Sequence, residues 1–315
     1  MKIQKVSLIG LGAIGSFFAP KLYQYLGKEN FRVIAAGERK KRLETLGVII
    51  NQVSYHFTVV DPQEPVDPAD LVIISVKNMG LKQAIEDIRG HIGEHTQILC
   101  VINGVDSEEQ VAAVYGWNHV LYSYVRVSIE MKDGAADYDP TKGKIYFGEA
   151  DNHVLSTRVQ DIIQLFKACD IHYQIEQDMI KGLWFKFMCN VAENLTCALL
   201  TIPYGAFRVS EHANAIRRAA MQEVVNVAKA RGIHLGQKDI DRQNQLIQKL
   251  PFENKPSTLQ DIESGRPTEV EMFAGKMLQL GKELGVSTPL NWLFYHGIKT
   301  LEEKNRGDFI PPAKV

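Results

Sequence analysis

A doubly wound parallel α/β sheet followed by an all-helical second domain is the fold class that the sequence predicts. Short apolar runs alternate with helical patterns through the first half of the chain, which is typical of buried parallel strands. A glycine-rich turn separates the first run from the first helical pattern. Beyond Asp178 only helical patterns follow. We therefore expect two domains, residues 1–177 and 178–315, with the boundary near Gln177.

The glycine-rich turn predicts a dinucleotide site. A strand is expected at residues 5–9 and a helix at residues 16–26, and between them stand Gly10, Leu11, Gly12, Ala13, Ile14 and Gly15. In a Rossmann-type fold Gly10 permits the tight turn, Gly12 lets the pyrophosphate approach the backbone, and Gly15 lets helix and strand pack closely. The helix N-terminus then offers N–H groups to the phosphates. The alternative is a glycine-rich turn without a ligand.

The turn after the second expected strand, Arg32–Ala36, indicates which dinucleotide binds. It reads Gly37-Glu38-Arg39-Lys40-Lys41-Arg42. An acidic side chain there suits the ribose hydroxyl of NAD, whereas basic side chains suit the 2′-phosphate of NADP. We expect NADP(H), with Arg39 as a bidentate phosphate ligand. Glu38 keeps NAD as an alternative, and a solvated basic turn would need no cofactor.

Further strands are expected at residues 48–50, 56–60, 71–76, 98–102, 119–125, 144–147 and 171–175, and a helix at 155–169. Ligands of such sheets bind beyond the carboxyl ends of the strands. Lys77 and the pair Asn103-Gly104 follow two of those ends. We expect both to face the cofactor. A surface lysine and an ordinary Asn-Gly turn are the alternatives.

The most informative stretch of the second domain is Gly182–Leu199, GLWFKFMCNVAENLTCAL. Its apolar residues recur every three or four positions, which predicts a largely buried helix. Lys186, Asn190 and Asn194 lie four residues apart and so share one side of that helix. Because burying such groups without partners is costly, a bound substrate could compensate. A solvent-facing stripe is the alternative.

Further helices are expected at residues 213–231 and 268–284, with a loop holding a short helical turn at 250–266. Asn254 and Ser257 fall in that loop. Glu269 falls in the first turn of a helix, where a carboxylate also complements the helix dipole.

Composition excludes several classes of partner. Thirty-six basic residues against thirty-seven acidic ones give a net charge of −1, so we expect neither nucleic acid nor a membrane as a partner. The four cysteines lack metal-ligand spacing, so we expect buried thiols and no metal. No secretory signal or membrane span is recognisable, and we expect a cytoplasmic protein that is a monomer or a homodimer.

Over nearly its whole length the chain resembles the ketopantoate reductase family, the 2-dehydropantoate 2-reductases. The most specific matching piece is LWxKxxxNxxxN, which contains Lys186, Asn190 and Asn194. The other pieces are the glycine motif, SVK ending at Lys77, ING with Asn103, NxxS of Asn254 and Ser257, and TE of Glu269.

The resemblance implies roles for these residues in an NADPH-dependent reduction of a 2-oxo acid, 2-dehydropantoate to pantoate, within pantothenate biosynthesis. It implies that Lys186 is the proton donor and that Glu269 holds lysine, cofactor and substrate in register. It further implies that Asn103 touches both cofactor and substrate and that Lys77 touches the cofactor. The implied ligands of the substrate's carboxylate and hydroxyl are Asn190, Asn194, Asn254 and Ser257.

The chain departs from the family pattern at two positions. Many members have an arginine before the glycine that ends the second strand, where this chain has Ala36. Some have an asparagine ten residues after the second helix asparagine, where this chain has Tyr204, so another 2-oxo acid could be the substrate. Two further functions stay open: a β-hydroxyacid dehydrogenase acting on a 3-hydroxy acid, and a non-catalytic NADPH sensor.

The expected chemistry is hydride transfer to the C2 carbonyl, with negative charge gathering on its oxygen. A lysine with a reference pKa of about 10.4 can stabilise that charge and then donate a proton. We therefore expect the amine of Lys186 to face the nicotinamide across an interdomain crevice.

Overall fold

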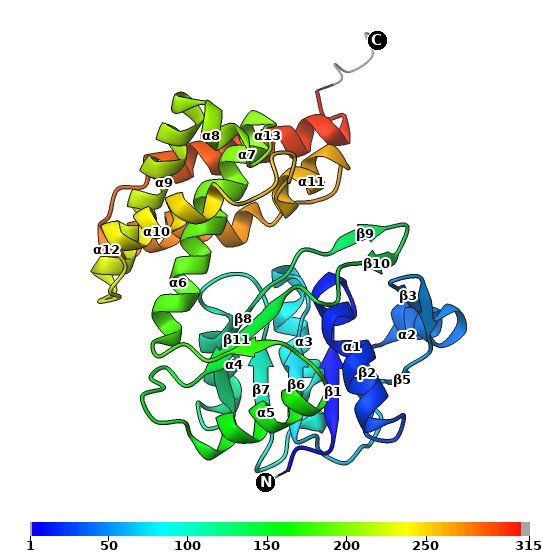
Figure 1. The fold of residues 1–315 in the computed structure, drawn as a ribbon. Helices are drawn as coiled ribbons and strands as arrows, with labels where there is room; N and C mark the ends of the chain where they lie inside the picture. Colours follow the sequence, from blue (N-terminus) through cyan, green and yellow to red (C-terminus); the bar gives the residue numbers. More distant parts are fainter. Residues whose placement is uncertain (1, 310–315) are drawn as a thin grey trace. The chain divides into compact units, whose positions relative to one another are not determined.

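The computed structural model describes residues 2–309 and divides the chain into two compact units (Figure 1). Unit 1 comprises Met1–Leu183 and unit 2 comprises Trp184–Val315. The division falls inside a helix, whereas the sequence placed a domain boundary near Gln177, and that boundary stays a prediction. The described part of unit 2 contains helices and no strand, in keeping with the predicted fold class.

Unit 1 is built on an eight-stranded sheet with the order β12-β11-β8-β7-β6-β1-β2-β5. All neighbouring pairs are parallel except β8 with β11. The strands are β1 Val6–Ile9, β2 Phe31–Ile34, β5 Thr58–Val60, β6 Leu71–Ile74, β7 Gln97–Cys100, β8 Val120–Arg126, β11 Lys144–Gly148 and β12 Tyr173–Gln174. Every residue of β1 and β6 is buried, which explains their apolar sequences.

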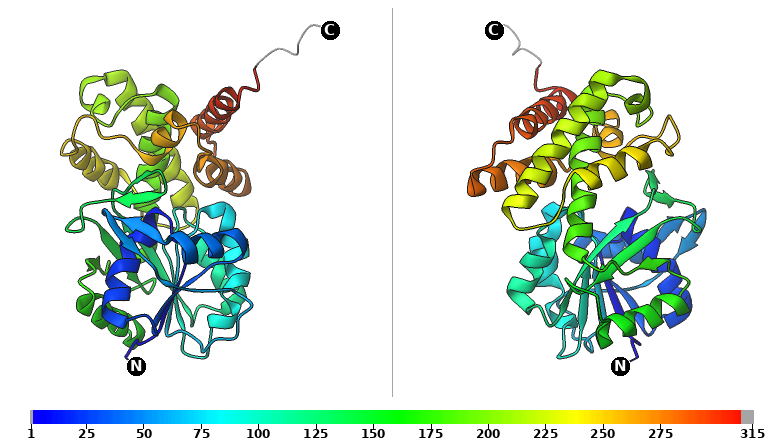
Figure 2. Two further views of the ribbon diagram at one scale, coloured as in Figure 1. Left: turned by 90° about the vertical axis from the view of Figure 1, so that its right-hand side faces the viewer. Right: turned by 60° about the vertical axis from the view of Figure 1, so that its left-hand side comes forward.

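Helices cover both faces of this sheet, with α1 and α5 on one face and α3 and α4 on the other (Figure 2). Phe18 of α1 packs against Phe166 of α5 with ring centroids 6.3 Å apart. The helices of unit 1 are α1 Ala13–Leu26, α2 Gly37–Leu46, α3 Leu81–Asp87, α4 Ser107–Tyr115 and α5 Thr157–Ala168, with 3₁₀ turns η1 Asn78–Gly80 and η2 Arg89–His91. These layers confirm the doubly wound arrangement.

The register of the central strands brings three chain ends to one edge of the sheet. Val6 of β1 pairs with Phe31 of β2 and with Leu71 of β6, so the three strands run side by side without offset. The segments that follow them, which begin at Gly10, Ala35 and Ser75, therefore leave the sheet together. This is the edge where ligands of such sheets bind.

A second, four-stranded sheet in unit 1 was not predicted. Its order is β4-β3-β10-β9, formed by β3 Val48–Ile50, β4 Val53–Tyr55, β9 Glu130–Lys132 and β10 Ala135–Asp137. The sequence predicted only β3. The other strands are only three residues long. Because β9 is exposed throughout, β4 is mostly exposed and β10 buries only Ala136, they lack the apolar pattern that reveals a strand.

Unit 2 is a set of packed helices. They are α6 Met179–Cys189, which begins in unit 1, then α7 Leu195–Leu200, α8 Ala206–Val209, α9 Glu211–Ala230, α10 Gln237–Ile247, α11 Ser257–Glu263, α12 Lys276–Leu284 and α13 Pro289–Arg306. Two π-helical turns interrupt the series: η3 Asn190–Asn194 and η4 Glu271–Gly275. The two π turns contact each other.

The π turn η3 corrects the prediction of one regular helix over residues 182–199. A π turn closes its hydrogen bonds over five residues and therefore holds one more residue than an α turn. Side chains that follow it are rotated away from the stripe that α-helical spacing predicts. Similarly, Glu269 precedes the helical residues of η4 instead of lying in a first helical turn, and its carbonyl oxygen accepts from the N–H of Met272 (3.1 Å).

Candidate active site

The glycine loop between β1 and α1 needs glycine at two positions because the protein itself leaves no room. Gly10 has φ of +95°, and a Cβ there would lie 2.6 Å from the backbone of Ser75. The hydroxyl of Ser75 donates to the carbonyl oxygen of Gly10 (2.7 Å) and so joins the ends of β1 and β6. A Cβ at Gly15 would overlap the carbonyl oxygen of Gly10. Both residues therefore fix the shape of the turn.

Gly12 is different because nothing in the protein requires a glycine there. Its φ of −111° is open to any residue, and a Cβ would meet no atom within 4 Å. Gly12 directly precedes α1, whose first N–H groups lack partners within the helix. An open space beside a helix N-terminus fits the close approach of a phosphate. The structure thus offers a cradle that suits a dinucleotide pyrophosphate.

The basic turn at the start of α2 divides into paired and clustered charges. Lys40 forms an ion pair with Glu64, and Lys41 pairs with Glu38 at 2.7 Å. The guanidinium of Arg39 donates to the carbonyl oxygen of Leu11 in the glycine loop. Partial burial and the neighbouring charge of Arg42 lower the pKa of Arg39. An anion beside these two guanidinium groups would relieve their repulsion.

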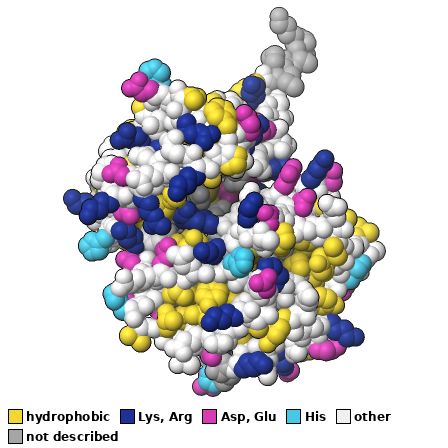
Figure 3. Space-filling view, in the orientation of Figure 1, with side chains coloured by type: hydrophobic (Ala, Val, Ile, Leu, Met, Phe, Trp, Pro, Cys, Tyr) yellow, Lys and Arg dark blue, Asp and Glu magenta, His cyan; other side chains and the backbone are white. Residues whose placement is uncertain are grey.

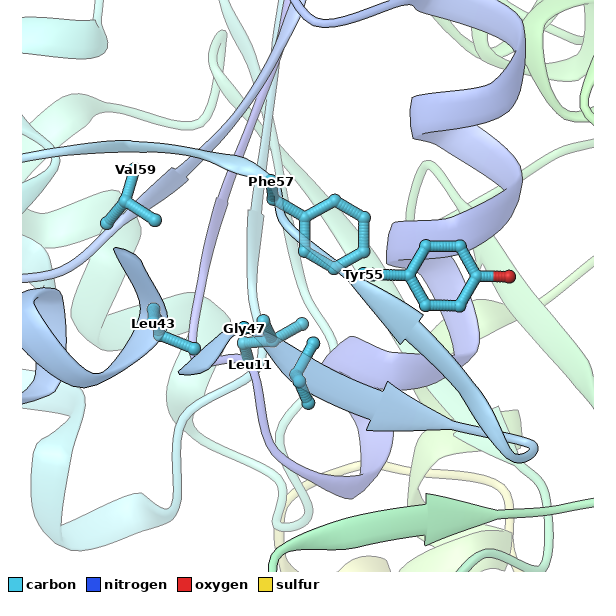
Figure 4. Close-up of a pocket in the computed structure, with 7 residues that line it drawn as sticks. Leu11, Leu43, Gly47, Tyr55, Phe57 and Val59 are labelled. Carbon is cyan, nitrogen blue, oxygen red and sulfur yellow. The ribbon is translucent and has the colours of Figure 1, made fainter. Parts of the chain in front are cut away.

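A small apolar hollow lies behind the glycine loop, with about 150 Å³ of empty space (Figure 4). Its walls come from Leu11, from Leu43 of α2 and from the segment that carries β3 to β5. The labelled hydroxyl of Tyr55 points away from it (Figure 4). With no charged side chain in its lining, the hollow offers nothing to a phosphate, and we interpret it as a packing gap.

Lys77 and Asn103 lie where the sequence predicted, just beyond β6 and β7. Lys77 is exposed and precedes η1, where its carbonyl oxygen accepts from the N–H of Gly80 (2.8 Å). Asn103 is half-buried, and Gly104 after it has φ of +114°, which favours glycine. Both residues stand beyond the carboxyl edge of the same sheet as the glycine loop.

A buried carboxyl group that sequence reasoning missed fixes the segment after Asn103. Glu108 in the first turn of α4 accepts from the hydroxyl of Ser107 (2.8 Å) and from the N–H of Ser123 in β8 (3.1 Å). Burial raises the pKa of Glu108 to about 7, although its hydrogen bonds oppose that shift. This carboxyl group ties α4 to the sheet.

In unit 2 the stripe residues differ in burial. Lys186 in α6 and Asn190 at the start of η3 are half-buried, whereas Asn194 at the end of η3 is buried. The apolar residues between them are buried, as predicted, with Trp184 and Phe187 in edge contact at 5.7 Å. This is a polar stripe on a buried helix and not an ordinary solvent face.

Tyr204 joins two of the predicted substrate ligands. Its hydroxyl donates to Oδ1 of Asn194 (3.0 Å), and its backbone N–H donates to the carbonyl oxygen of Asn254 (2.9 Å). Burial and the charge of Glu193 raise the pKa of Tyr204 well above its usual value. The side chain is therefore a neutral hydrogen-bond donor. Ser257, which begins α11, and Asn254 are both exposed.

The segment before Glu269 is held by the C-terminal helix α13. Glu302 accepts from the backbone N–H of Thr268 (2.7 Å) and from its hydroxyl (2.6 Å). Lys299 bridges Glu271 (3.2 Å) and Glu302 (3.5 Å). Glu269 itself is half-buried. The segment that leads to it is thus held by charged groups from α13.

Two residues bear on the stripe although the sequence analysis assigned them no role. Tyr204 was noted only as a departure from a family pattern. Glu193 lies inside η3 and forms a buried ion pair with Arg217 of α9 at 2.8 Å. A glutamate within an apolar helix is the signal that could have found it, because a buried charge needs a partner.

Other kinds of site find no support among residues 2–309. These residues hold no group of three or more His, Cys, Asp or Glu side chains arranged for a metal ion. Within the same range no helix is both long and apolar enough to cross a bilayer. Acidic and basic side chains are interspersed over the face shown in Figure 3, as the net charge suggests.

The chain matches one family along most of its length. Residues 6–152 match the family model described as ketopantoate reductase PanE/ApbA, and residues 178–302 match the model of its C-terminal part. A 2-dehydropantoate 2-reductase of Aquifex aeolicus is 26% identical over 312 residues, covering 97% of this chain and 99% of that protein.

Solved structures share the fold. A 2-dehydropantoate 2-reductase from Geobacter metallireducens has a TM-score of 0.81 at 22% identity, covering 94% of this chain and 99% of that one. D-mandelate dehydrogenase with NADH and anilino(oxo)acetate has a TM-score of 0.84 at 20% identity, covering 96% and 99%. With both parts of the family model matched, the chain belongs to the ketopantoate reductase family and is an oxidoreductase of the 2-dehydropantoate 2-reductase type.

Proposed function

We propose that the chain reduces the C2 carbonyl of a 2-oxo acid with NADPH, with 2-dehydropantoate as its substrate and pantoate as its product. The observation that carries the proposal is the match of both parts of the family, together with a polar stripe on the buried helix of unit 2. The β-hydroxyacid dehydrogenase and the sensor remain as outcomes of the test below. We further propose a cytoplasmic protein, because all four cysteines are unbonded thiols. We also propose that it is a monomer or a homodimer.

The proposed cofactor residues lie in unit 1. The open space at Gly12 and the N-terminus of α1 would receive the pyrophosphate, while Gly10 and Gly15 hold the loop in shape. The backbone of Leu11, Ala13 and Ile14 completes this loop. Lys77 and Asn103, beyond the same edge of the sheet, would contact the cofactor, and Asn103 also the substrate.

The basic turn supports NADPH over NADH. Glu38, the residue that could select NAD, is paired with Lys41, and Lys40 is paired with Glu64. Arg39 and Arg42 remain as two neighbouring guanidinium groups, and Arg39 already contacts the glycine loop. A 2′-phosphate would find a bidentate donor in Arg39.

Replacing Arg39 tests the cofactor assignment. We expect Arg39→Ala to weaken NADPH binding about 10- to 100-fold, the worth of charge-assisted hydrogen bonds, and to leave NADH binding almost unchanged. Arg89→Ala, at an exposed arginine of η2 that pairs with Glu86, is the control and should preserve both affinities. Titration of nucleotide fluorescence measures them. Equal losses for NADPH and NADH in Arg39→Ala would contradict a role at the 2′-phosphate.

The proposed chemistry assigns each remaining residue a task. When bound, NADPH supplies the hydride that reduces the C2 carbonyl. Lys186 stabilises the negative charge on the carbonyl oxygen and donates the proton that completes the hydroxyl group. Glu269 holds Lys186, cofactor and substrate in register. The carboxylate and hydroxyl of the substrate are held by Asn190, Asn194, Asn254 and Ser257.

The deciding experiment follows NADPH absorbance with 2-dehydropantoate and a panel of other 2-oxo acids. The reverse assay supplies NADP⁺ with 3-hydroxy acids. We expect turnover with 2-dehydropantoate and none with 3-hydroxy acids. Oxidation of a 3-hydroxy acid would instead indicate a β-hydroxyacid dehydrogenase. NADPH binding without turnover on any acid would indicate a sensor, and turnover only with a different 2-oxo acid would correct the substrate.

A further inference from the structure

A buried charge network stands directly behind the π turn η3. The carboxylate of Glu193 accepts from Nη1 of Arg217 in α9 (2.8 Å) and, through both oxygens, from Nε2 of Gln243 in α10 (3.0 Å each). The two charged side chains are 5% and 1% exposed. Solvent therefore contributes little to their stabilisation, and the neighbouring helices must supply it.

Arg217 is itself held from several sides. Its Nε and Nη2 donate to Oδ1 of Asn214 (3.1 and 2.8 Å), and Nη2 also donates to Oδ1 of Asn244. Its guanidinium carbon lies 5.1 Å from the ring centroid of Phe207. A guanidinium fixed in this way can present its remaining donors in only one direction. Glu193 is thereby held in direction as well as in charge.

The position of Glu193 in the chain makes this anchor relevant to the stripe. Glu193 lies three residues after Asn190 and immediately before Asn194, within a single π turn. Because Glu193 lies inside the turn, fixing its side chain also fixes the rotation of the turn about the helix axis. That rotation sets the directions of Asn190 and Asn194. The Tyr204 hydroxyl then fixes the amide of Asn194.

Stability alone is a weak explanation for such a network. A buried ion pair can often be replaced by well-packed apolar residues without loss of stability, whereas its geometry is directional. A π turn also departs from the regular helix that the flanking sequence favours, so something must hold it in place. Donors from two other helices, converging on one carboxylate inside the turn, can do this.

We propose that Glu193, Arg217 and Gln243 are positioning residues that hold η3 as a π turn and so aim Asn190 and Asn194 at the substrate. The proposal rests on the proposed function, because it takes those asparagines to be substrate ligands. None of the three residues is required to touch the substrate. Their effect is on the direction of two side chains that do.

The mildest test removes Gln243 alone. We expect Gln243→Met to leave the ion pair and the fold intact and to raise KM for 2-dehydropantoate several-fold. Glu193→Gln removes the charge and should raise KM about tenfold or more, since small displacements of binding groups are costly. In both variants the dissociation constant for NADPH should stay within about twofold, because the nucleotide residues lie in unit 1.

A matched control separates positioning from general stability. Glu223, which lies in α9 like Arg217, is a buried carboxylate that accepts from the N–H groups of Leu290 (2.8 Å) and Asn291 (3.1 Å) at the start of α13. Glu223→Gln should lower the Tm and leave KM for 2-dehydropantoate unchanged. If Glu193→Gln and Gln243→Met also lower the Tm with no change in KM, the network is only structural and the proposal is overturned.

A structural readout keeps the proposal testable without activity. The double variant Glu193→Leu, Arg217→Met replaces the pair by apolar side chains and leaves no unpaired charge. We expect its crystal structure to show an α-helical turn over residues 190–194 with Asn194 displaced. A preserved π turn would overturn the proposal. If the unaltered protein reduces no 2-oxo acid, the proposed function fails, and this crystal structure still decides whether the network shapes the turn.

Discussion

The glycine loop of unit 1 and the stripe helix of unit 2 are the two proposed recognition elements, and they are built in opposite ways. In the loop, the proposed contacts come from the backbone. Neighbouring backbone atoms leave no room for a Cβ at Gly10 and Gly15, whereas the space beside Gly12 is open. In the stripe helix, the proposed contacts come from side chains. Their directions depend on the π turn η3, on the ion pair between Glu193 and Arg217 of α9, and on the hydrogen bond from Tyr204 to Asn194.

This contrast explains why the glycine loop could be predicted from the sequence and the stripe helix only in part. A backbone site needs a local motif, which residues 10–15 supply. A side-chain site needs partners that are distant in sequence, and no local spacing reveals them. The two elements should therefore respond differently to substitution. A change in the loop should alter cofactor affinity or stability, whereas a change in the helix should alter KM for the substrate or kcat.

The largest effect that would sharpen this comparison is expected at Lys186. Lys186→Ala should lower kcat about 100- to 10,000-fold, the range for loss of a general acid, while NADPH binding is retained. Lys181→Ala, a lysine on the same helix α6, is the control and should keep nearly normal turnover. Steady-state kinetics and a fluorescence titration with NADPH measure both quantities. Near-normal kcat in Lys186→Ala would remove the lysine from the mechanism.

The loop offers a test within a single motif. At Gly15 a Cβ would overlap backbone, so Gly15→Ala should cost about 3 kcal/mol of unfolding free energy, as overpacked sites do. At Gly12 a Cβ meets no protein atom, so Gly12→Ala should leave stability almost unchanged and weaken NADPH about tenfold by blocking the approach of the pyrophosphate. Denaturant unfolding and nucleotide titration distinguish the two. A Gly12→Ala protein that binds NADPH normally would break the comparison.

Much of the fold was predictable because it follows from buried apolar segments. The strands at the centre of the sheet and the helices expected at residues 16–26, 155–169 and 213–231 were predicted correctly in type, with ends shifted by a few residues, whereas no range was predicted for α10 or for the long helix α13. The second sheet of unit 1 was missed because its strands are only three residues long and carry no such pattern.

The candidate site was predictable in its residues and not in its geometry. Spacing identified Lys186, Asn190 and Asn194, but it did not reveal η3, because a single π turn within a helix has no sequence motif of its own here. Likewise, the sequence favoured Arg39 among the four cations of the basic turn after β2, but it could not show which of the four are ion-paired. Only the structure separates the paired Lys40 and Lys41 from the clustered Arg39 and Arg42. The roles of all these residues stay predictions.

The smallest effect is expected at Tyr204, where the side-chain site depends on one neutral hydrogen bond. Tyr204→Phe keeps the ring and loses the donor to Asn194, a loss of about 1 kcal/mol, so KM for 2-dehydropantoate should rise about fivefold. Tyr204→Asn removes the aromatic wall and supplies a carboxamide instead. It should favour 2-dehydropantoate, which carries a hydroxyl, over 3-methyl-2-oxobutanoate, which lacks one.

The two variants therefore distinguish a role of Tyr204 in orienting Asn194 from a role in selecting between the two acids. If Tyr204 only orients Asn194, both variants raise KM and neither changes the ratio of kcat/KM for the two acids. If its ring also lines the substrate site, Tyr204→Asn changes that ratio and Tyr204→Phe does not. Unchanged KM in both variants would show that the Asn194 amide needs no fixed orientation. The side-chain site of unit 2 would then depend, like the glycine loop, only on residues close together in the sequence, and the contrast between the two units would fail.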